Sequence, residues 1–396
     1  MPFDVAAVQQ SLKAEGFDGW LLYDFHGSNP IAARLLGTAG GAKMTTRRWF
    51  YLVPAEGEPR GLVHAIERRT LDALPGTKTV YAGRRQLEEG LTTLLAGVKR
   101  VAMEYSRNCA IPYISRIDGG TLELVRSRGA EVESSGDLVQ RFEAVWDDHA
   151  LATHRDASQA LYRVKDRAFE LIARRVRDGE AMTEFAVQQQ MAAWFEEERL
   201  VSDSPPVVAA QENAGDPHYL PTARRTRQIQ KDELVLLDLW AKKQDDPAAV
   251  FADITWVGFT GRSVPADMTR AFQAVGAARD AAAALVQESA REQRDLRGFE
   301  VDRAARHLLE RAGFAEHILH RTGHNLGRDV HGNGAHMDDY ESHDDRRLIP
   351  GTGFTIEPGL YFESFGVRTE INMYYGEREA LVTGPVQSEI VRLAEV

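Results

Sequence analysis

Three short stretches near the C-terminal end decide the fold: HRTGHNLGRDVHGNG (320–334), FTIEPGLYF (354–362) and VRTEINMYY (367–375). They place three histidines and two glutamates among glycines and short apolar runs. Imidazole nitrogens and carboxylate oxygens are the ligands that Zn, Mn and Co accept. The stretches therefore predict part of a divalent-metal site, with the upstream chain folding around it and supplying two further aspartates.

Four acidic residues of this half lie in or beside apolar runs that are typical of buried strands, namely Asp238, Asp253, Glu357 and Glu370. A single buried acid is ordinarily paired with an arginine or a backbone amide. Burying a carboxylate without a partner costs several kcal/mol, and these runs hold few basic residues. Four such acids therefore indicate a shared source of positive charge. A pair of divalent ions with bridging carboxylates would supply it.

Composition excludes several classes of function. The chain has 396 residues, 43% of them hydrophobic and 27% charged, which is ordinary for a globular protein of two or three domains. The net charge of -11 argues against nucleic-acid binding, which needs a basic surface. The sequence shows no signal-peptide pattern and no apolar run of membrane-spanning length, and its one cysteine, Cys109, cannot form an internal disulfide. We expect a cytoplasmic protein with no membrane or nucleic-acid partner.

Strands alternating with helices predict an α/β domain over residues 1–150. The expected helices cover 4–16, 87–95 and the segment from 136 to 141, and the expected strands cover 19–24, 49–54, 61–65, 100–105 and 122–125. The segment AEGEPR between 49–54 and 61–65 predicts a hairpin.

The composition changes near residue 145, where long charged helical segments begin. One such segment ends at Gly179, and the next begins at Thr183. Strands are expected at 205–210, 234–240 and 250–259, and helices at 268–292 and 301–312. Because strands and helices alternate less regularly here, residues 151–396 are predicted to form a second, α+β domain.

The order and spacing of the acidic residues and one histidine resemble the ligand signature of the pita-bread metallopeptidases, the family of methionine aminopeptidase, aminopeptidase P and prolidase. The five matching positions are Asp238, Asp253, His324, Glu357 and Glu370. TGHNLGRDVH, FTIEPGLY and GVRTE are similar to the prolidase branch in particular. The resemblance implies a pita-bread catalytic domain over 151–396, and more loosely a smaller α/β domain of the prolidase type over 1–150.

The resemblance implies a role for each of these five residues at two divalent metal ions, with Mn, Co or Zn as candidates. Asp238 would chelate one ion, and Asp253 and Glu370 would bridge both. His324 and Glu357 would complete the second ion. A bridging water or hydroxide would then attack the scissile carbonyl.

Further catalytic roles are implied for residues around the metals. Glu357 would be the general base that passes a proton to the leaving nitrogen. His331 would hydrogen-bond the substrate, His218 would lie near the leaving side, and His320 would be a third pocket histidine. Arg368 would support the metal carboxylates.

The sequence departs from the family pattern between the first two aspartates. The family reads D-x-G and then G-Y-x-x-D-x-T-R, whereas this chain reads DLW and AVFADITW. Asp238 and Asp253 are 15 residues apart, which predicts an insertion at 239–252. Trp256 stands near the position of the family arginine, so we expect a rebuilt pocket wall.

Several polar residues allow two interpretations. Arg346 either binds the substrate's C-terminal carboxylate as a bidentate partner or is a solvated charge in an acidic run. Asp245 and Asp246 are alternative ligands that rank below Asp253. We expect His336 and His343 at the surface.

The resemblance implies an Xaa-Pro dipeptidase, or prolidase, that hydrolyses short proline-containing peptides and forms a homodimer. An X-Pro bond has no N–H, so its leaving nitrogen needs a proton from groups near the metals. The alternatives are an Xaa-Pro aminopeptidase for longer peptides, creatinase-like C–N cleavage without metal, and a non-catalytic binding protein that kept the fold. Retention of all five ligand positions argues against the last two. The native metal and the substrate length stay open.

Overall fold

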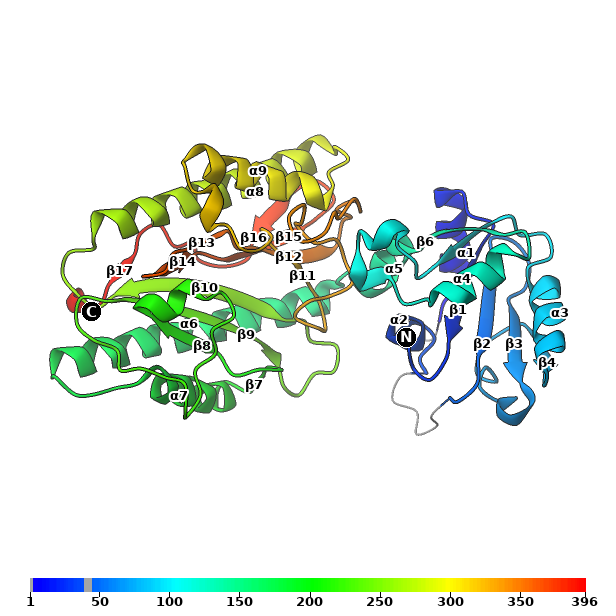
Figure 1. The fold of residues 1–396 in the computed structure, drawn as a ribbon, viewed down its shortest axis with the longest axis horizontal. Helices are drawn as coiled ribbons and strands as arrows, with labels where there is room; N and C mark the ends of the chain where they lie inside the picture. Colours follow the sequence, from blue (N-terminus) through cyan, green and yellow to red (C-terminus); the bar gives the residue numbers. More distant parts are fainter. Residues whose placement is uncertain (1–2, 39–44) are drawn as a thin grey trace. The chain divides into compact units, whose positions relative to one another are not determined.

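The chain folds into two compact units, Met1–Glu143 and Ala144–Val396 (Figure 1). The computed structural model describes residues 3–38 and 45–396. The boundary expected from the sequence, at residue 150, falls inside the long helix α6 (Asp148–Arg177), which belongs wholly to the second unit.

The described part of the first unit forms a six-stranded sheet in the order β4-β3-β2-β1-β5-β6. β2 and β3 run antiparallel, as the predicted hairpin requires, and β1 also pairs antiparallel with β2. The strands are β1 (Gly19–Asp24), β2 (Trp49–Pro54), β3 (Arg60–His64), β4 (Thr77–Tyr81), β5 (Arg100–Met103) and β6 (Glu131–Ser134). The helices are α1 (Val5–Glu15), α2 (Pro30–Leu35), α3 (Arg84–Leu94), α4 (Gly119–Arg126) and α5 (Gly136–Glu143). Separate apolar clusters cover the two faces of the sheet.

One expected strand of this unit is wrong, because residues 122–125 belong to helix α4. Asp118 caps that helix by accepting a hydrogen bond from the backbone N–H of Thr121. Leu122 and Val125 are buried, three residues apart, which is the spacing of one helix face. The actual strand, β6, buries only Val132, so its sequence carries little apolar signal.

The second unit begins with α6 and α7 (Glu184–Glu197), and Thr183 caps α7 as predicted. The next strands are β7 (Leu200–Val201), β8 (Val207–Ala210), β9 (Leu234–Lys243) and β10 (Ala252–Phe259). They form a sheet in the order β17-β10-β9-β7, with β8 also paired to β9 and β17 (Val391–Arg392) on the edge. Helices α6 and α7 pack against the outer face of this sheet (Figure 1).

A second sheet has the order β11-β12-β15-β16, beside a two-stranded ribbon of β13 and β14. Its strands are β11 (Asn325–Leu326), β12 (Thr352–Ile356), β15 (Ile371–Tyr375) and β16 (Ala380–Val382), and the ribbon is β13 (Gly359–Tyr361) and β14 (Gly366–Arg368). Helices α8 (Ala266–Glu292) and α9 (Gly298–Arg311) cover this sheet (Figure 1). They begin two and three residues before the predicted starts, and α9 ends one residue before its predicted end. None of the helices in the described ranges has the length and apolar content needed to cross a bilayer.

The predicted insertion at 239–252 extends a hairpin. Strand β9 runs to Lys243, beyond the expected end at 240, and pairs antiparallel with β10. In the connecting turn Asp245 pairs with Arg199, and Asp246 lies 2.6 Å from His149. These two aspartates are therefore committed to other partners at the end of the hairpin.

Candidate metal centre

The candidate site lies where β9 and β10 face the second sheet. Side chains alternate along a strand, and the odd-numbered apolar residues of β9 pack toward α6 and α7. Asp238 therefore points to the opposite face. It pairs in register with Thr255 of β10, and Asp253 lies two residues from Thr255 on the same face.

The second sheet contributes the remaining predicted donors at the ends of its strands. His324 immediately precedes β11, Glu357 follows β12, and Glu370 precedes β15. The backbone N–H of Glu370 donates to the carbonyl of Thr255 at 3.2 Å, which joins the two sheets at the site.

The structure brings three of the predicted donors within reach of one ion, and places Glu357 beside His324 and Asp238 beside Arg368. Donor atoms of Asp253, His324 and Glu370 all lie within 4.8 Å of one another, and all three residues are buried. His324 Nε2 is 3.6 Å from Asp253 Oδ2 and 3.3 Å from Glu357 Oε1. Arg368 Nη2 donates to Asp238 Oδ2 at 2.5 Å, and Arg368 Nε is 3.9 Å from Glu357 Oε2.

The donor set fits a divalent cation. Asp253 Oδ1 and Glu370 Oε1 are buried with no hydrogen-bond partner among the described residues. His324 Nδ1 lies 3.3 Å from the carbonyl of Asn325, so this nitrogen carries the proton and the Nε2 lone pair faces the carboxylates. The lone pairs of His324 and of the two carboxylate oxygens face the same small buried space. Burying them there is unfavourable unless a positive charge lies between them.

The pKa shifts of these residues have the same cause. Burial, and then the charge of neighbouring carboxylates, raises the pKa values of Asp253 and Glu370 well above their usual range. Burial lowers the pKa of His324 to about 3. In the absence of a cation the acids would therefore retain protons, whereas a bound ion would replace them.

Three polar residues that sequence reasoning missed hold the donors in place. Thr255 Oγ1 donates to Glu370 Oε2 at 2.8 Å, and Thr355 Oγ1 donates to Glu357 Oε1 at 3.0 Å. The Asn372 side chain accepts from the Asp253 N–H at 3.0 Å and donates to the Asp253 carbonyl. The sequence did contain a signal for them. In DIT (253–255), TIE (355–357) and EIN (370–372) an acid and a threonine or asparagine stand two positions apart. This is the spacing of neighbouring side chains on one face of a strand.

His320 belongs to a chain of hydrogen bonds beside the donors. Its Nδ1–H donates to the carbonyl of Arg321 at 2.6 Å, so its Nε2 accepts from the Tyr361 hydroxyl, also at 2.6 Å. Arg368 Nη1 donates to the same hydroxyl at 2.7 Å. Both imidazole nitrogens of His320 are thus engaged, and Tyr361, which sequence reasoning did not single out, links it to Arg368.

The other two predicted histidines lie on the solvent side. The His331 ring centroid is 4.3 Å from that of His324, and His331 is exposed to solvent. Desolvation by neighbouring protein groups, and then the charges of Arg321 and His218, lowers the pKa of His331 to about 4. His218 is exposed in the loop after Gln211–Gly215, and its backbone N–H donates to Asp216 Oδ1 at 3.0 Å.

The expected surface position of His336 is wrong, and one of the two interpretations of Arg346 is excluded. His336 is fully buried, and its Nδ1 accepts the backbone N–H of Asn325 at 3.1 Å, directly behind His324. Arg346 is only 3% exposed, and its Nε and Nη2 donate to Asp344 at 2.9 and 2.6 Å, so it is not a solvated charge. Within the acidic run Asp344 is buried together with Arg346, whereas Asp345 is exposed. His343 is exposed, as expected.

Trp256 takes no part in the site. Its ring faces α6, where Lys165 Nζ lies 3.9 Å from the ring centroid and Tyr162 meets it edge-on. It is therefore on the face of β10 opposite to Asp253. The residue of this hairpin that does stand beside the donors is Trp240, which pairs in register with Asp253.

Comparison with known proteins gives a consistent result. Residues 153–377, more than half of the chain, match metallopeptidase family M24. The chain is 33% identical over 168 residues to an Xaa-Pro dipeptidase of Lactobacillus helveticus, covering 41% of this chain and 40% of that protein. It is 29% identical over 208 residues to an Xaa-Pro dipeptidase of Lactobacillus delbrueckii subsp. lactis, covering 52% and 51%. The chain thus matches about half or less of the length of these curated relatives.

Solved structures agree with the fold over nearly the whole chain. Dipeptidase PepE from Mycobacterium ulcerans superposes with a TM-score of 0.69 at 21% identity, covering 98% of this chain and 96% of that one. The prolidase from Pyrococcus horikoshii OT3 gives 0.62 at 19% identity, covering 98% and 99%. At this identity the likeness establishes the fold, a pita-bread unit preceded by a smaller α/β unit.

Proposed function

This chain belongs to metallopeptidase family M24, and we propose that it is an Xaa-Pro dipeptidase that hydrolyses short peptides before proline with two divalent metal ions. The observation that carries the proposal is the buried donor set, with two carboxylate oxygens that have no hydrogen-bond partner in the described part of the chain. The names of the curated relatives support the substrate class.

The ions would be held by the five donors. Asp238 would bind one ion, Asp253 and Glu370 would serve both, and His324 and Glu357 would complete the second. Nitrogen and oxygen donors suit Mn, Co and Zn. When bound, such ions polarise a peptide carbonyl and make water a stronger nucleophile near neutral pH.

The residues of the chain would handle the protons of the reaction. Glu357 is partly accessible to solvent. We propose that it accepts a proton from the water whose oxygen adds to the scissile carbonyl carbon. The same carboxyl group would pass that proton to the proline nitrogen as the C–N bond breaks, because this nitrogen has no hydrogen of its own in the peptide. Arg368, beside both Asp238 and Glu357, would balance the negative charge of the carboxylates.

His331 would act as a neutral hydrogen-bond donor. With its pKa lowered to about 4, its imidazole is uncharged near pH 7 and offers one N–H to a substrate oxygen. We propose that His218 lies near the leaving group, the part of the substrate that contains the proline nitrogen. We assign His320 the positioning of Tyr361 and Arg368, because both of its ring nitrogens are engaged.

One observation favours a second candidate, an Xaa-Pro aminopeptidase that accepts longer peptides. The guanidinium group of Arg346 is committed to Asp344, and its Nη1 donates to the carbonyl of Asn333 at 2.7 Å. Arg346, the arginine that the sequence analysis suggested for the C-terminal carboxylate of a dipeptide, is therefore already bound to other groups of the protein.

Hydrolysis of Ala-Pro and Ala-Pro-Ala separates the two candidates. Chelator-treated protein would be assayed on both peptides after addition of Mn, Co or Zn. Metal-dependent preference for Ala-Pro supports the dipeptidase. Preference for the tripeptide supports the aminopeptidase, and no hydrolysis of either peptide with any metal contradicts both.

We also propose that the protein acts as a homodimer in the cytoplasm. The resemblance to the prolidase branch supports the dimer, and the single cysteine is compatible with a reducing compartment. Light scattering on the purified chain would measure the mass of the assembly, and a monomeric mass would contradict the dimer.

A further inference from the structure

We infer that Trp240 limits the size of the substrate residue that carries the free amino group. The inference rests on the proposed peptidase function. Trp240 lies on β9, two residues after Asp238 and on the same face of the strand.

Trp240 is a direct neighbour of the candidate donors. In the β9–β10 pairing it lies opposite Asp253, and side chains in such pairs have Cβ atoms about 5 Å apart. The residues on either side of it, Leu239 and Ala241, belong to the cluster packed under α6 and α7. The indole therefore projects from the face that carries Asp238 and Asp253.

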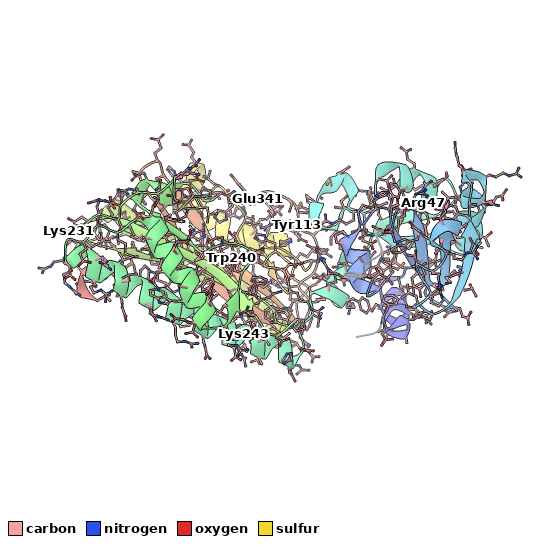
Figure 2. The ribbon with its side chains drawn as sticks, turned by 90° about the horizontal axis from the view of Figure 1, so that it is seen from below. Arg47, Tyr113, Lys231, Trp240, Lys243 and Glu341 are labelled. Carbon is pink, nitrogen blue, oxygen red and sulfur yellow. The ribbon has the colours of Figure 1, made fainter. Side chains whose placement is uncertain are left out.

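The indole is held in place on two sides. Its Nε1 donates to Asp203 Oδ1 at 2.7 Å. It also packs against the apolar cluster that contains Trp146, Val250, Phe251, Leu326 and Val330. Leu326 is two residues after His324 and Val330 is the residue before His331, so the ring bridges the strand of Asp253 and the segment of the two histidines. Figure 2 labels Trp240 on its ribbon.

Trp240 is nevertheless not fully buried, so part of this residue is accessible to a ligand. A substrate with a free ammonium group is attracted to the acidic side of the site, formed by Asp238 and Asp253. The residue that bears this ammonium must then lie against the indole. The face of an indole accepts a cation well, but a fixed ring leaves little room for a large side chain.

This arrangement favours glycine or alanine at the amino-terminal position of the substrate and disfavours leucine or phenylalanine. The test compares kcat/KM for Gly-Pro, Ala-Pro, Leu-Pro and Phe-Pro in the metal-loaded protein. The variants are Trp240→Ala, Trp240→Phe and a matched control, Trp256→Phe, which alters a tryptophan of the same hairpin on the opposite face.

Wild type should prefer Gly-Pro and Ala-Pro, and Trp240→Ala should raise the ratio of Phe-Pro to Gly-Pro by roughly tenfold or more. Trp240→Phe should give a smaller increase, and Trp256→Phe should leave the ratio unchanged. If the alanine variant does not fold, as judged by its thermal transition, the phenylalanine variant decides alone. An unchanged ratio, or a wild-type preference for bulky residues, overturns the inference and leaves the proposed function standing. If wild type cleaves none of the four dipeptides and does not cleave Ala-Pro-Ala either, the inference and the proposed function are both overturned.

Discussion

At the scale of single residues, Glu357 is the group on which turnover should depend most. Its Oε1 faces His324 and Thr355, while its Oε2 faces Arg368. Glu357→Gln keeps the shape but removes the proton acceptor, so we expect kcat to fall by roughly 10²–10⁴-fold. Steady-state kinetics measures the loss, and circular dichroism should show an unchanged fold.

A matched control is available on the neighbouring turn. Glu363 is exposed and lies between β13 and β14, so Glu363→Gln should leave kcat unchanged. Equal activity of the Glu357 variant and wild type would remove Glu357 from the mechanism.

Asn372 is a second residue with a measurable role. Its side chain bonds both the N–H and the carbonyl of Asp253, and Asn372→Ala would leave these buried groups without partners at a cost of about 1–3 kcal/mol each. We expect a lower melting temperature and weaker Mn²⁺ binding, measured by differential scanning calorimetry and by titration calorimetry. Wild-type metal affinity in this variant would show that Asp253 needs no such support.

At the scale of elements, the close contact of the segment before β11 with β12 positions His324. A Cβ added to Gly323 would lie 2.1 Å from the Thr355 carbonyl oxygen, a backbone atom that cannot move aside alone. Gly323→Ala should therefore separate the two strands, lower the melting temperature and weaken Mn²⁺ binding by roughly tenfold or more.

The same segment contains the control. A Cβ at Gly327 would meet no atom closer than 3.9 Å, so Gly327→Ala should bind Mn²⁺ as wild type does. Similar affinities for the two alanine variants would contradict the view that the Gly323 contact places His324.

Elements were predictable where their signal was local. The start of α7 after the capping residue Thr183 and the hairpin of β2 and β3 follow from capping residues and turn composition. The strand expected at 122–125 failed because four apolar-rich residues do not distinguish a strand from one helix face.

At the scale of the whole molecule, metal binding should be coupled to folding and to pH. The pKa values of Asp253 and Glu370 are raised above those of the unfolded chain, so above the unfolded-state pKa values of about 4 the metal-free fold binds more protons than the unfolded chain does. Its stability should therefore fall as the pH rises above about 4. An ion displaces these protons, so its stabilising effect should grow as the pH rises.

Thermal melts with Mn²⁺ and with chelator, at about pH 5.5 and about pH 8, test this coupling. We expect a larger gain in melting temperature from Mn²⁺ at the higher pH. A gain that does not change with pH would contradict a site built from protonated buried acids.

The sequence by itself determined the chemistry of the site. The donor types, their order along the chain and their positions beside buried strands were all visible, because ligand identity and strand periodicity are local properties. The family resemblance predicted that these groups share one site, but it is the tertiary structure that brings them together. Asp253 and Glu370 are 117 residues apart, and their contact depends on how the two sheets pack. The burial of His336, the commitment of Arg346 to Asp344 and the place of Trp240 beside Asp253 depend on the same packing. They could not be predicted, because each is a contact with a partner that local sequence does not specify.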